Sequence, residues 1–453
     1  MKKKSLFECV ECGYQSPKYY GKCPQCENWN SIIEVDYKEK ENNKNGHLHT
    51  NVKAIKLVEI DDKQQERVST NITEFDRVLG GGLVPESIVL IGGEPGVGKS
   101  TLLLELAGLL SKNSNTLYYS GEESLSQIKR RADRLSIKSD NIHLLTMGSI
   151  EDVKDNIDVI KPEFLIIDSI QTIFSQKKGL ISGSVSSLKY ITGEIIELAK
   201  NKSITVFIIG HITKDGSIAG PKTLEHMVDV VLYFQGELKS DYRILRTEKN
   251  RFGPVDEIGV FQMTGKGLIS VDDPSQLFIG QRDSTEPGLA VFPADRGTRA
   301  ILLEIQALVT ESPFAGNPRR ISVGFDGYRM SMLLSVIEKK LKIPFYKSDV
   351  FINITGGMNI KETAGDLAVI SALISSHKNI PLPTDTLIIG EVGLTGEIRP
   401  VGGIEKRIKE GIRQGYKNFI LPEIQAEKLG KNNIKIKSIK NVLELYSIIS
   451  GQY

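Results

Sequence analysis

The strongest constraint on the fold is a glycine-rich loop that lies between an apolar strand and an apolar helix. Residues 87–91 read Ser-Ile-Val-Leu-Ile, and residues 101–107 read Thr-Leu-Leu-Leu-Glu-Leu-Ala. Glycines in such a loop let backbone N–H groups converge on phosphate oxygens at the positive end of the following helix. The pattern predicts a phosphate-binding loop made of Gly93, Glu94, Pro95, Gly96, Val97, Gly98, Lys99, Ser100 and Thr101.

Hydrolysis of a bound nucleoside triphosphate also requires a metal ion and a cation at the phosphates. We expect Lys99 to contact the β- and γ-phosphates of ATP and Ser100 to ligate Mg²⁺. Asp168 ends the apolar run 164–167, where a second acidic residue reaches the water shell of the metal. An aspartate at a strand end can also cap the next helix, so both roles stay open for Asp168.

Three more polar residues follow strand-like runs. Glu122 and Glu123 come after the run 117–120, and His211 comes after the run 205–210. Because open α/β sheets bind ligands at the carboxyl ends of their strands, one of the two glutamates can polarise the attacking water. His211 can report the state of the γ-phosphate to the loop that follows, and a structural hydrogen bond is its alternative role.

The four cysteines all lie within the first 26 residues, as Cys9-x2-Cys12 and Cys23-x2-Cys26. Two such turns place four sulfurs around a tetrahedral ion, and the metal replaces a core that so short a segment cannot build. The spacing predicts a zinc ribbon that holds one Zn²⁺. Disulfides are the alternative, and a redox Cys-x-x-Cys is disfavoured because there are two pairs and no surrounding βαβ pattern.

The chain has 453 residues, which exceeds what one hydrophobic core usually serves. The ribbon is expected at 1–35, a polar flexible linker at 36–55, and alternating strand and helix patterns fill 56–273. These patterns predict an α/β fold with a mostly parallel sheet. Asp272-Asp273-Pro274-Ser275 marks a boundary, and we expect a second α/β domain at 284–453.

Charge and hydropathy restrict the cellular context. The net charge is only +2, so a surface that binds nucleic acid must be local. Apolar stretches such as 204–210 are too short to cross a bilayer, and no apolar signal core follows the first four residues. We therefore expect a cytoplasmic protein without a membrane partner.

Four motifs occur in order along the chain. They are the four-cysteine segment, Gly80-Gly81-Gly82 ahead of the phosphate loop, Ser120-Gly121-Glu122-Glu123-Ser124, and Lys249-Asn250-Arg251-Phe252-Gly253. Together they resemble the RadA (Sms) family of bacterial DNA repair proteins, for which the last motif is a signature. The resemblance covers essentially the whole chain.

This resemblance implies a RecA-like ATPase core in a homo-oligomeric ring, a hexamer similar to that of the replicative helicase DnaB. It also implies ATP-driven branch migration and extension of strand exchange on single-stranded and branched DNA, with a RecA-type recombinase as a partner. By the same resemblance, Glu122 is the catalytic glutamate, and Lys249 and Arg251 reach into the ATP site of a neighbouring subunit. A surface hairpin with solvated cations is the alternative for this pair.

The C-terminal region resembles the proteolytic domain of Lon. Ala364 stands at the place of the nucleophile, and Glu405 stands where the catalytic lysine would be. Both members of the catalytic dyad are then absent, which implies an inactive protease domain. Thr363 and Lys406 each lie one residue away, so a shift in the alignment would restore either one.

DNA affinity comes mainly from cations that contact phosphates. Two basic, glycine-rich loops follow strand ends of the ATPase core, and loops of this kind line the channel of RecA-like rings. A second basic patch in the C-terminal region could bind a duplex, although scattered arginines are usually a solvated surface. The candidate residues are Lys177, Lys178, Lys214 and Lys222 in the loops and Arg296, Arg299, Arg319 and Arg320 in the patch.

Two other functions stay open at this point. One is an ATP-gated protease, which Ala364 and Glu405 disfavour. The other is an ATP switch that regulates a partner protein without moving along DNA. DNA-stimulated ATP turnover with strand displacement would separate a motor from a switch.

Overall fold

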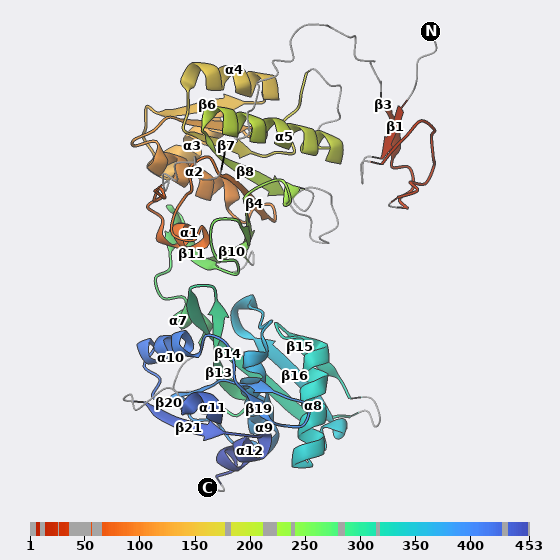
Figure 1. Cartoon of the computed structure of the whole chain (residues 1–453), viewed down its shortest axis with the longest axis vertical. Helices are drawn as coiled ribbons and strands as arrows, with labels where there is room; N and C mark the ends of the chain where they lie inside the picture. The colour runs from red at the N-terminus through yellow and green to blue at the C-terminus, as the bar shows by residue number, and fades with distance from the viewer. Residues whose placement is uncertain are drawn as a thin grey trace. The chain divides into compact units, whose positions relative to one another are not determined.

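The computed structural model describes residues 6–9, 14–25, 27–35, 56, 66–176, 183–211, 224–236, 241–279, 286–313, 318–427 and 434–451. The chain forms two compact units, which divide between Val271 and Asp272 (Figure 1). This division falls at the start of the predicted boundary segment. The expected linker at 36–55 lies outside the described residues.

The N-terminal segment folds into a small antiparallel sheet. Its strands are β1 (Leu6–Cys9), β2 (Gln15–Ser16) and β3 (Ile32–Val35), in the order β2-β1-β3. Cys9, Cys23 and Ile32 are buried together, with few apolar side chains around them. So small a core needs a further source of stability. The predicted Zn²⁺ would supply it.

The rest of the first unit is built on a nine-stranded sheet in the order β12-β11-β10-β9-β4-β8-β7-β5-β6. Six strands, from β6 across to β9, run parallel, and the last three are added antiparallel. The parallel strands are β4 (Ile88–Gly93), β5 (Thr116–Ser120), β6 (Ile142–Thr146), β7 (Phe164–Asp168), β8 (Thr205–His211) and β9 (Val230–Gln235). The antiparallel strands are β10 (Tyr242–Asn250), β11 (Ile258–Thr264) and β12 (Gly267–Ser270).

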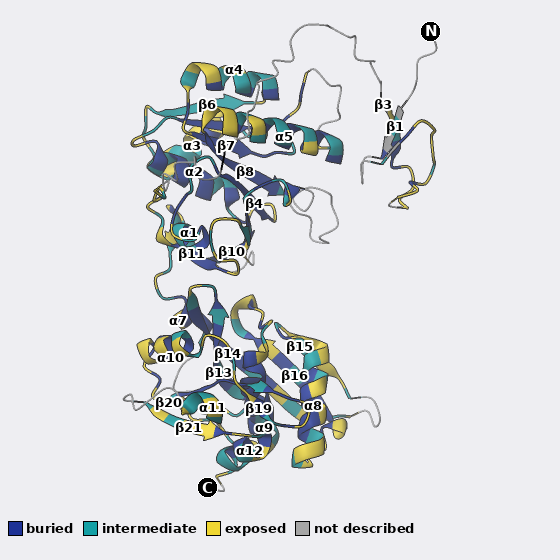
Figure 2. Ribbon diagram, in the orientation of Figure 1, coloured by how far each residue is buried: buried dark blue, intermediate teal, exposed yellow. Residues whose placement is uncertain are grey.

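Helices cover both faces of this sheet, and Figure 2 shows buried strands between them. One core contains residues of α1 (Thr73–Val78), α2 (Lys99–Leu110) and α3 (Leu125–Arg134). The other contains residues of α4 (Ile150–Ile160) and α5 (Val185–Lys202). Successive residues of β7 alternate between the two cores, as the period of a strand requires.

The second unit contains a mixed seven-stranded sheet in the order β15-β16-β14-β13-β17-β20-β21 and a separate hairpin of β18 and β19. Its strands are β13 (Leu289–Arg296), β14 (Arg299–Glu311), β15 (Arg320–Val323), β16 (Ser348–Ile354), β17 (Thr386–Ile388), β18 (Glu391–Val392), β19 (Ile398–Arg399), β20 (Asn418–Pro422) and β21 (Lys435–Ile439). Helix α9 (Asp366–Lys378) is buried along nearly its whole length against this sheet. The other helices are α7 (Ser275–Phe278), α8 (Gly327–Leu341), α10 (Ile404–Arg413), α11 (Glu423–Ala426) and α12 (Val442–Ile449), with 3₁₀ turns at Phe345–Lys347, Thr355–Gly357 and Thr363–Gly365.

Helix α7 belongs to the second unit. The hydroxyl of Ser275 donates to Glu410 at 2.6 Å and accepts the N–H of Leu302 at 3.1 Å. The second unit therefore begins before residue 284, where the sequence pattern placed its start. In the described part of the chain, no helix has the length and apolarity needed to cross a bilayer.

Candidate nucleotide site

The phosphate loop connects the end of β4 to the first turn of α2, as predicted. Gly98 caps α2 with a left-handed φ of 113°, a conformation that side chains disfavour. At Gly93 there is no room for a side chain, because a Cβ would lie 2.4 Å from the carbonyl oxygen of Phe234. The backbone of this loop can therefore turn its N–H groups toward a phosphate at the start of α2.

Lys99 is buried at the centre of this loop. Its Nζ donates to the carbonyl oxygens of Gly93 at 2.7 Å and Glu94 at 2.9 Å. Burial lowers the pKa of Lys99 to about 8, although the carboxylates of Asp168 and Glu122 partly oppose this shift. The side chains of Asp168 and Glu122 thus lie near enough to Lys99 for their charges to act on it.

Asp168 ends β7 and is almost fully buried. Its Oδ2 accepts a hydrogen bond of 2.9 Å from the hydroxyl of Tyr118, which comes from the neighbouring strand β5. The carboxylate lies at the carboxyl end of the sheet, beside the phosphate loop. An oxygen ligand here fits the preference of Mg²⁺, so the residues present suit the metal that an ATP site requires.

The two glutamates after β5 have different surroundings. Glu122 is about half exposed, and its Oε1 accepts from Ser169 Oγ at 2.9 Å. Glu123 forms an ion pair with Arg131 of α3, and its backbone N–H donates to Ser120. Glu123 is thus paired with a cation, and Glu122 is the more exposed of the two glutamates.

Lys249 and Arg251 lie at the end of β10. Lys249 Nζ donates to the carbonyl oxygens of Glu225 at 2.7 Å and Val228 at 2.8 Å, and burial lowers its pKa. Arg251 is half exposed and forms a 3.0 Å ion pair with Asp229. Both cations are therefore fixed against the segment that precedes β9.

This segment lies at the amino end of β4, away from the phosphate loop. The Asp229 carboxylate accepts the backbone N–H of Ile88, the first residue of β4, at 3.1 Å. Gly93, where the loop begins, is five residues further along the strand, or about 17 Å at about 3.3 Å per residue. The structure thus separates Lys249 and Arg251 from the phosphate loop of the same chain.

The two cysteine turns have matching backbone geometry. The N–H of Cys9 donates to the carbonyl of Tyr14, and the N–H of Cys23 donates to the carbonyl of Asn28, each at 2.9 Å and each five residues further on. Both thiols are buried in the same small core. This geometry fits a tetrahedral thiolate site. Cys12 and Cys26 lie outside the described residues. The described residues alone contain no group of three or more side chains that could hold a metal ion.

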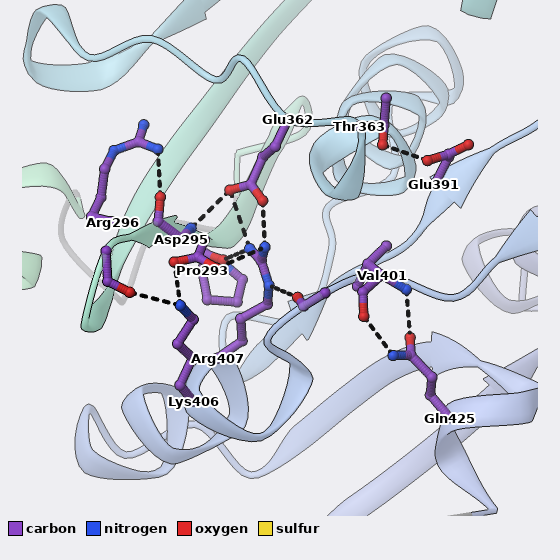
Figure 3. A network of polar contacts seen from close by, with 12 residues as sticks. Pro293, Asp295, Arg296, Glu362, Thr363, Glu391, Val401, Lys406, Arg407 and Gln425 are labelled. Atoms are coloured by element: carbon purple, nitrogen blue, oxygen red, sulfur yellow. Dashed lines mark hydrogen bonds and ion pairs between the residues drawn. The ribbon is translucent and has the colours of Figure 1, made fainter. Parts of the chain in front are cut away.

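Thr363 and Lys406, the neighbours of the Lon-like dyad positions Ala364 and Glu405, contact separate partners (Figure 3). Ala364 is buried and Glu405 is exposed. The Thr363 hydroxyl bonds to Glu391, whereas Lys406 Nζ forms an ion pair with Asp295 at 2.5 Å. Thr363 and Lys406 are thus each engaged by a different carboxylate.

The residue after Lys406, Arg407, makes several polar contacts in this region. Arg407 is 2 % exposed, pairs with Glu362 and donates to the carbonyl of Pro293 at 2.5 Å (Figure 3). A buried guanidinium needs several acceptors to offset its loss of hydration, and this one has them. The region around Lys406 and Arg407 is therefore organised as an ion-pair network.

The basic patch differs in part from its sequence prediction. Arg296 is 6 % exposed and donates to the carbonyl oxygens of Asp295 and Asn359, so it is not the surface cation that we expected. Arg319 and Arg320 are exposed, and Arg299 is partly buried. The four lysines predicted to line a channel, Lys177, Lys178, Lys214 and Lys222, lie outside the described residues.

Sequence reasoning missed several residues that hold the site together. Tyr118 and Ser169 bind the two acidic groups, Arg131 holds Glu123, and Asp229 holds Arg251. Ser169 could have been suspected, because it directly follows the candidate residue Asp168 at the end of β7. Tyr118 lies within an apolar strand, and only the pairing of β5 with β7 reveals its role.

Three family models match parts of the chain. The model described as the rubredoxin metal binding domain matches residues 7–34, and the KaiC ATPase model matches residues 68–145. The model of subunit ChlI of Mg-chelatase matches residues 329–425. Together with the sheets described above, these matches confirm the predicted order of a zinc ribbon, a RecA-like ATPase domain and a Lon-like α/β domain.

Curated relatives match nearly the whole length of the chain. The DNA repair protein RadA of Bacillus subtilis is 43% identical over 98% of both chains. The DNA repair protein RadA of Campylobacter jejuni is 46% identical over 98% of this chain and 99% of its own. That of Streptococcus pyogenes serotype M6 is 46% identical over 93% of both chains.

Proposed function

The chain belongs to the RadA family of bacterial DNA repair proteins, and from this premise we propose that it is a DNA-dependent ATPase that works as a ring-shaped motor. The ring is a homo-oligomer, a hexamer, that acts in the cytoplasm. It binds single-stranded and branched DNA and promotes branch migration and extension of strand exchange, together with a RecA-type recombinase. ATP with Mg²⁺ supplies the free energy, and Zn²⁺ stabilises the ribbon.

The observation that carries this proposal is the position of Lys249 and Arg251. Both lie at the end of the sheet opposite their own phosphate loop, so they are suited to the nucleotide of another subunit. A cation delivered across a subunit boundary stabilises charge that develops in the transition state. Hydrolysis then depends on the relative position of two subunits, which a motor requires.

The chemistry within one site divides among a few side chains. Lys99 and the loop backbone would bind the phosphates, and Ser100 and Asp168 would hold Mg²⁺, which neutralises charge on the transferred phosphoryl group. Glu122 orients the attacking water, and Ser169 fixes the Glu122 carboxylate. His211 lies next to Glu122 and leads into the loop that we propose contacts DNA.

The four lysines of the two predicted DNA-binding loops and Arg299, Arg319 and Arg320 remain our candidates for DNA contacts. These are backbone contacts, since cations without aromatic side chains track phosphates and do not read bases. Arg296 is left out because its guanidinium is buried against carbonyl groups.

The test compares ATP turnover with and without single-stranded DNA, then measures strand displacement on forked and three-stranded substrates. Lys99→Ala serves as the inactive control. DNA-stimulated turnover with displacement supports the motor. If DNA stimulates ATP turnover but no strand is displaced, the chain is an ATP switch and not a motor. If ATP turnover is the same with and without DNA, the proposal is wrong.

The protease alternative is tested separately with an unfolded protein substrate, with and without ATP. We propose that no cleavage occurs, because Ala364 offers no nucleophile and Thr363 and Lys406 are bound to separate carboxylates. Cleavage that disappears in Thr363→Ala would favour the protease.

A further inference from the structure

The buried contact between Tyr118 and Asp168 suggests how the metal site is held. Tyr118 is 1 % exposed and Asp168 is 4 % exposed, and 2.9 Å separates the phenol oxygen from Oδ2. In the parallel pairing of β5 and β7, Tyr118 lies opposite Ile166, two residues before Asp168. Such diagonal neighbours are within reach of an aromatic side chain, so the register of the sheet sets this hydrogen bond.

The phenol has little freedom to move. Its ring is part of the core beneath α2, together with Leu102, Leu103 and Ile166. A phenol keeps its proton at neutral pH, so the Tyr118 hydroxyl donates to Oδ2 of Asp168. A rigid neutral donor is thus fixed to one oxygen of a strand-end carboxylate.

We propose that Tyr118 is the positioning residue of the magnesium site. Its hydroxyl occupies Oδ2 of Asp168 and fixes the plane of the carboxylate, which leaves Oδ1 for the water shell of Mg²⁺. Groups that orient the ligands of a metal commonly contribute tenfold or more to its affinity. Tyr118 contacts neither nucleotide nor metal in this role, and it acts only through Asp168. This role depends on the proposed ATP site, because Tyr118 acts on that site through Asp168.

The next residue in the chain provides a matched control. The hydroxyl of Tyr119 donates to the carbonyl oxygen of Gly148, also at 2.9 Å, and its ring lies in the core on the opposite face of the sheet. Tyr118→Phe and Tyr119→Phe therefore each remove one hydroxyl of β5 and the hydrogen bond that this hydroxyl donates. Only the first hydrogen bond reaches the metal site.

The experiment titrates Mg²⁺ into the full chain with a fluorescent ATP analogue and measures nucleotide binding, which requires no turnover. Tyr118→Phe should raise the Mg²⁺ concentration for half-maximal binding about tenfold, and Tyr119→Phe should leave it unchanged. Binding without Mg²⁺ should be the same in both variants. Saturating Mg²⁺ should restore ATP turnover in Tyr118→Phe, because the carboxylate itself remains.

A second comparison separates positioning from general damage. In a chain that already carries Asp168→Asn, Tyr118→Phe should cause no further change in Mg²⁺ dependence, because its effect runs through the carboxylate. An unchanged Mg²⁺ requirement in Tyr118→Phe, or an equal shift in Tyr119→Phe, overturns the positioning role.

Failure of the proposed function gives a different result. If the unaltered chain shows no Mg²⁺-dependent nucleotide binding, or Lys99→Ala binds equally well, the ATP site itself is wrong. If binding depends on both Mg²⁺ and Lys99 but not on the Tyr118 hydroxyl, only the present inference fails.

Discussion

Oε1 of Glu122 lies 3.2 Å from Nε2 of His211, and the two residues follow or end strands that are separated in the sheet by β7. The approach lacks hydrogen-bond geometry, so no hydrogen bond holds the His211 imidazole against this carboxylate. Ser169, directly after β7, donates to the same Oε1. The ends of three strands thus meet at one carboxylate oxygen.

This contact predicts that His211→Ala uncouples DNA from hydrolysis. Nucleotide binding should stay normal, because Lys99 and Asp168 are untouched, while the DNA-stimulated rate falls about five- to tenfold. Turnover measured across a titration of single-stranded DNA is the readout, and His143→Ala in β6 is the control. Unchanged stimulation would assign His211 a structural role.

Glu122→Gln should retain ATP and reduce its turnover at least about a hundredfold, because the amide cannot take a proton from the attacking water. Glu123→Gln should lower turnover far less, since Glu123 is engaged by Arg131. Single-turnover hydrolysis and nucleotide retention distinguish the two variants. Normal hydrolysis by Glu122→Gln would move the catalytic role to Glu123 or elsewhere.

Much of this site follows from local sequence, since the phosphate loop, its strand and its helix are contiguous. The choice between Glu122 and Glu123 does not, because it depends on Arg131, one helix further on. The Tyr118 contact depends on the register of two strands, which alternating hydrophobicity cannot supply.

Contacts between residues distant in the sequence also explain why the predictions for Arg296 and for the start of the second unit differ from the structure. Arg296 looked like a surface cation because glycine and charge surround it, but the carbonyl of Asn359, distant in sequence, accepts from it. The segment 275–278 is too short for a helical period, and its place in the second unit depends on the contacts of Ser275 with Leu302 and Glu410. The order of domains was predictable because each domain contains its own motif.

The ribbon should contain one zinc per chain, held by Cys9, Cys12, Cys23 and Cys26, and Cys9→Ser should lose it. Zinc supplies most of the folding free energy of so small a module, so the N-terminal segment should become sensitive to protease. Ser31→Ala is the control, because it removes a hydroxyl 3.3 Å from the Cys9 sulfur but no ligand. Purified protein without zinc, or an equally protected ribbon in Cys9→Ser, would show the assignment to be wrong.

ATP affinity should fall as pH rises above about 8. The pKa of Lys99 is about 8 in the nucleotide-free chain, compared with an ordinary value of 10.5. Phosphates favour the charged amine, so binding above this pH takes up a proton, and affinity should drop up to about tenfold per pH unit. Titrations of a fluorescent ATP analogue from about pH 7.5 to about pH 9.5 measure this. Lys99→Arg, which keeps its charge, should give a weaker but flat profile, and a flat profile in the unaltered chain would contradict the prediction.

Arg251→Ala should bind ATP nearly normally and hydrolyse it poorly, because the lost guanidinium acts on the nucleotide of a neighbour. In the isolated chain Arg251 pairs with Asp229, about 17 Å along β4 from the phosphate loop, so its removal leaves that loop intact. Nucleotide binding and steady-state turnover, measured on the same preparation, check both halves of this statement. Weak binding by Arg251→Ala would instead indicate damage within its own site.

Mixing variants tests whether Arg251 acts across the subunit boundary. Lys99→Ala lacks its own site but still offers Arg251, and Arg251→Ala keeps its site but lacks the guanidinium. In equal mixtures, about one interface in four pairs a sound phosphate loop with a sound arginine, whatever the ring size, so turnover should recover to about that fraction. Replacing Lys99→Ala by the Lys99→Ala, Arg251→Ala double variant should abolish the recovery, since no sound arginine then remains. If mixed rings form but hydrolyse ATP no faster than the average of the two separate variants, Arg251 does not act across the boundary. Lys249 and Arg251 would then be solvated cations of a surface hairpin.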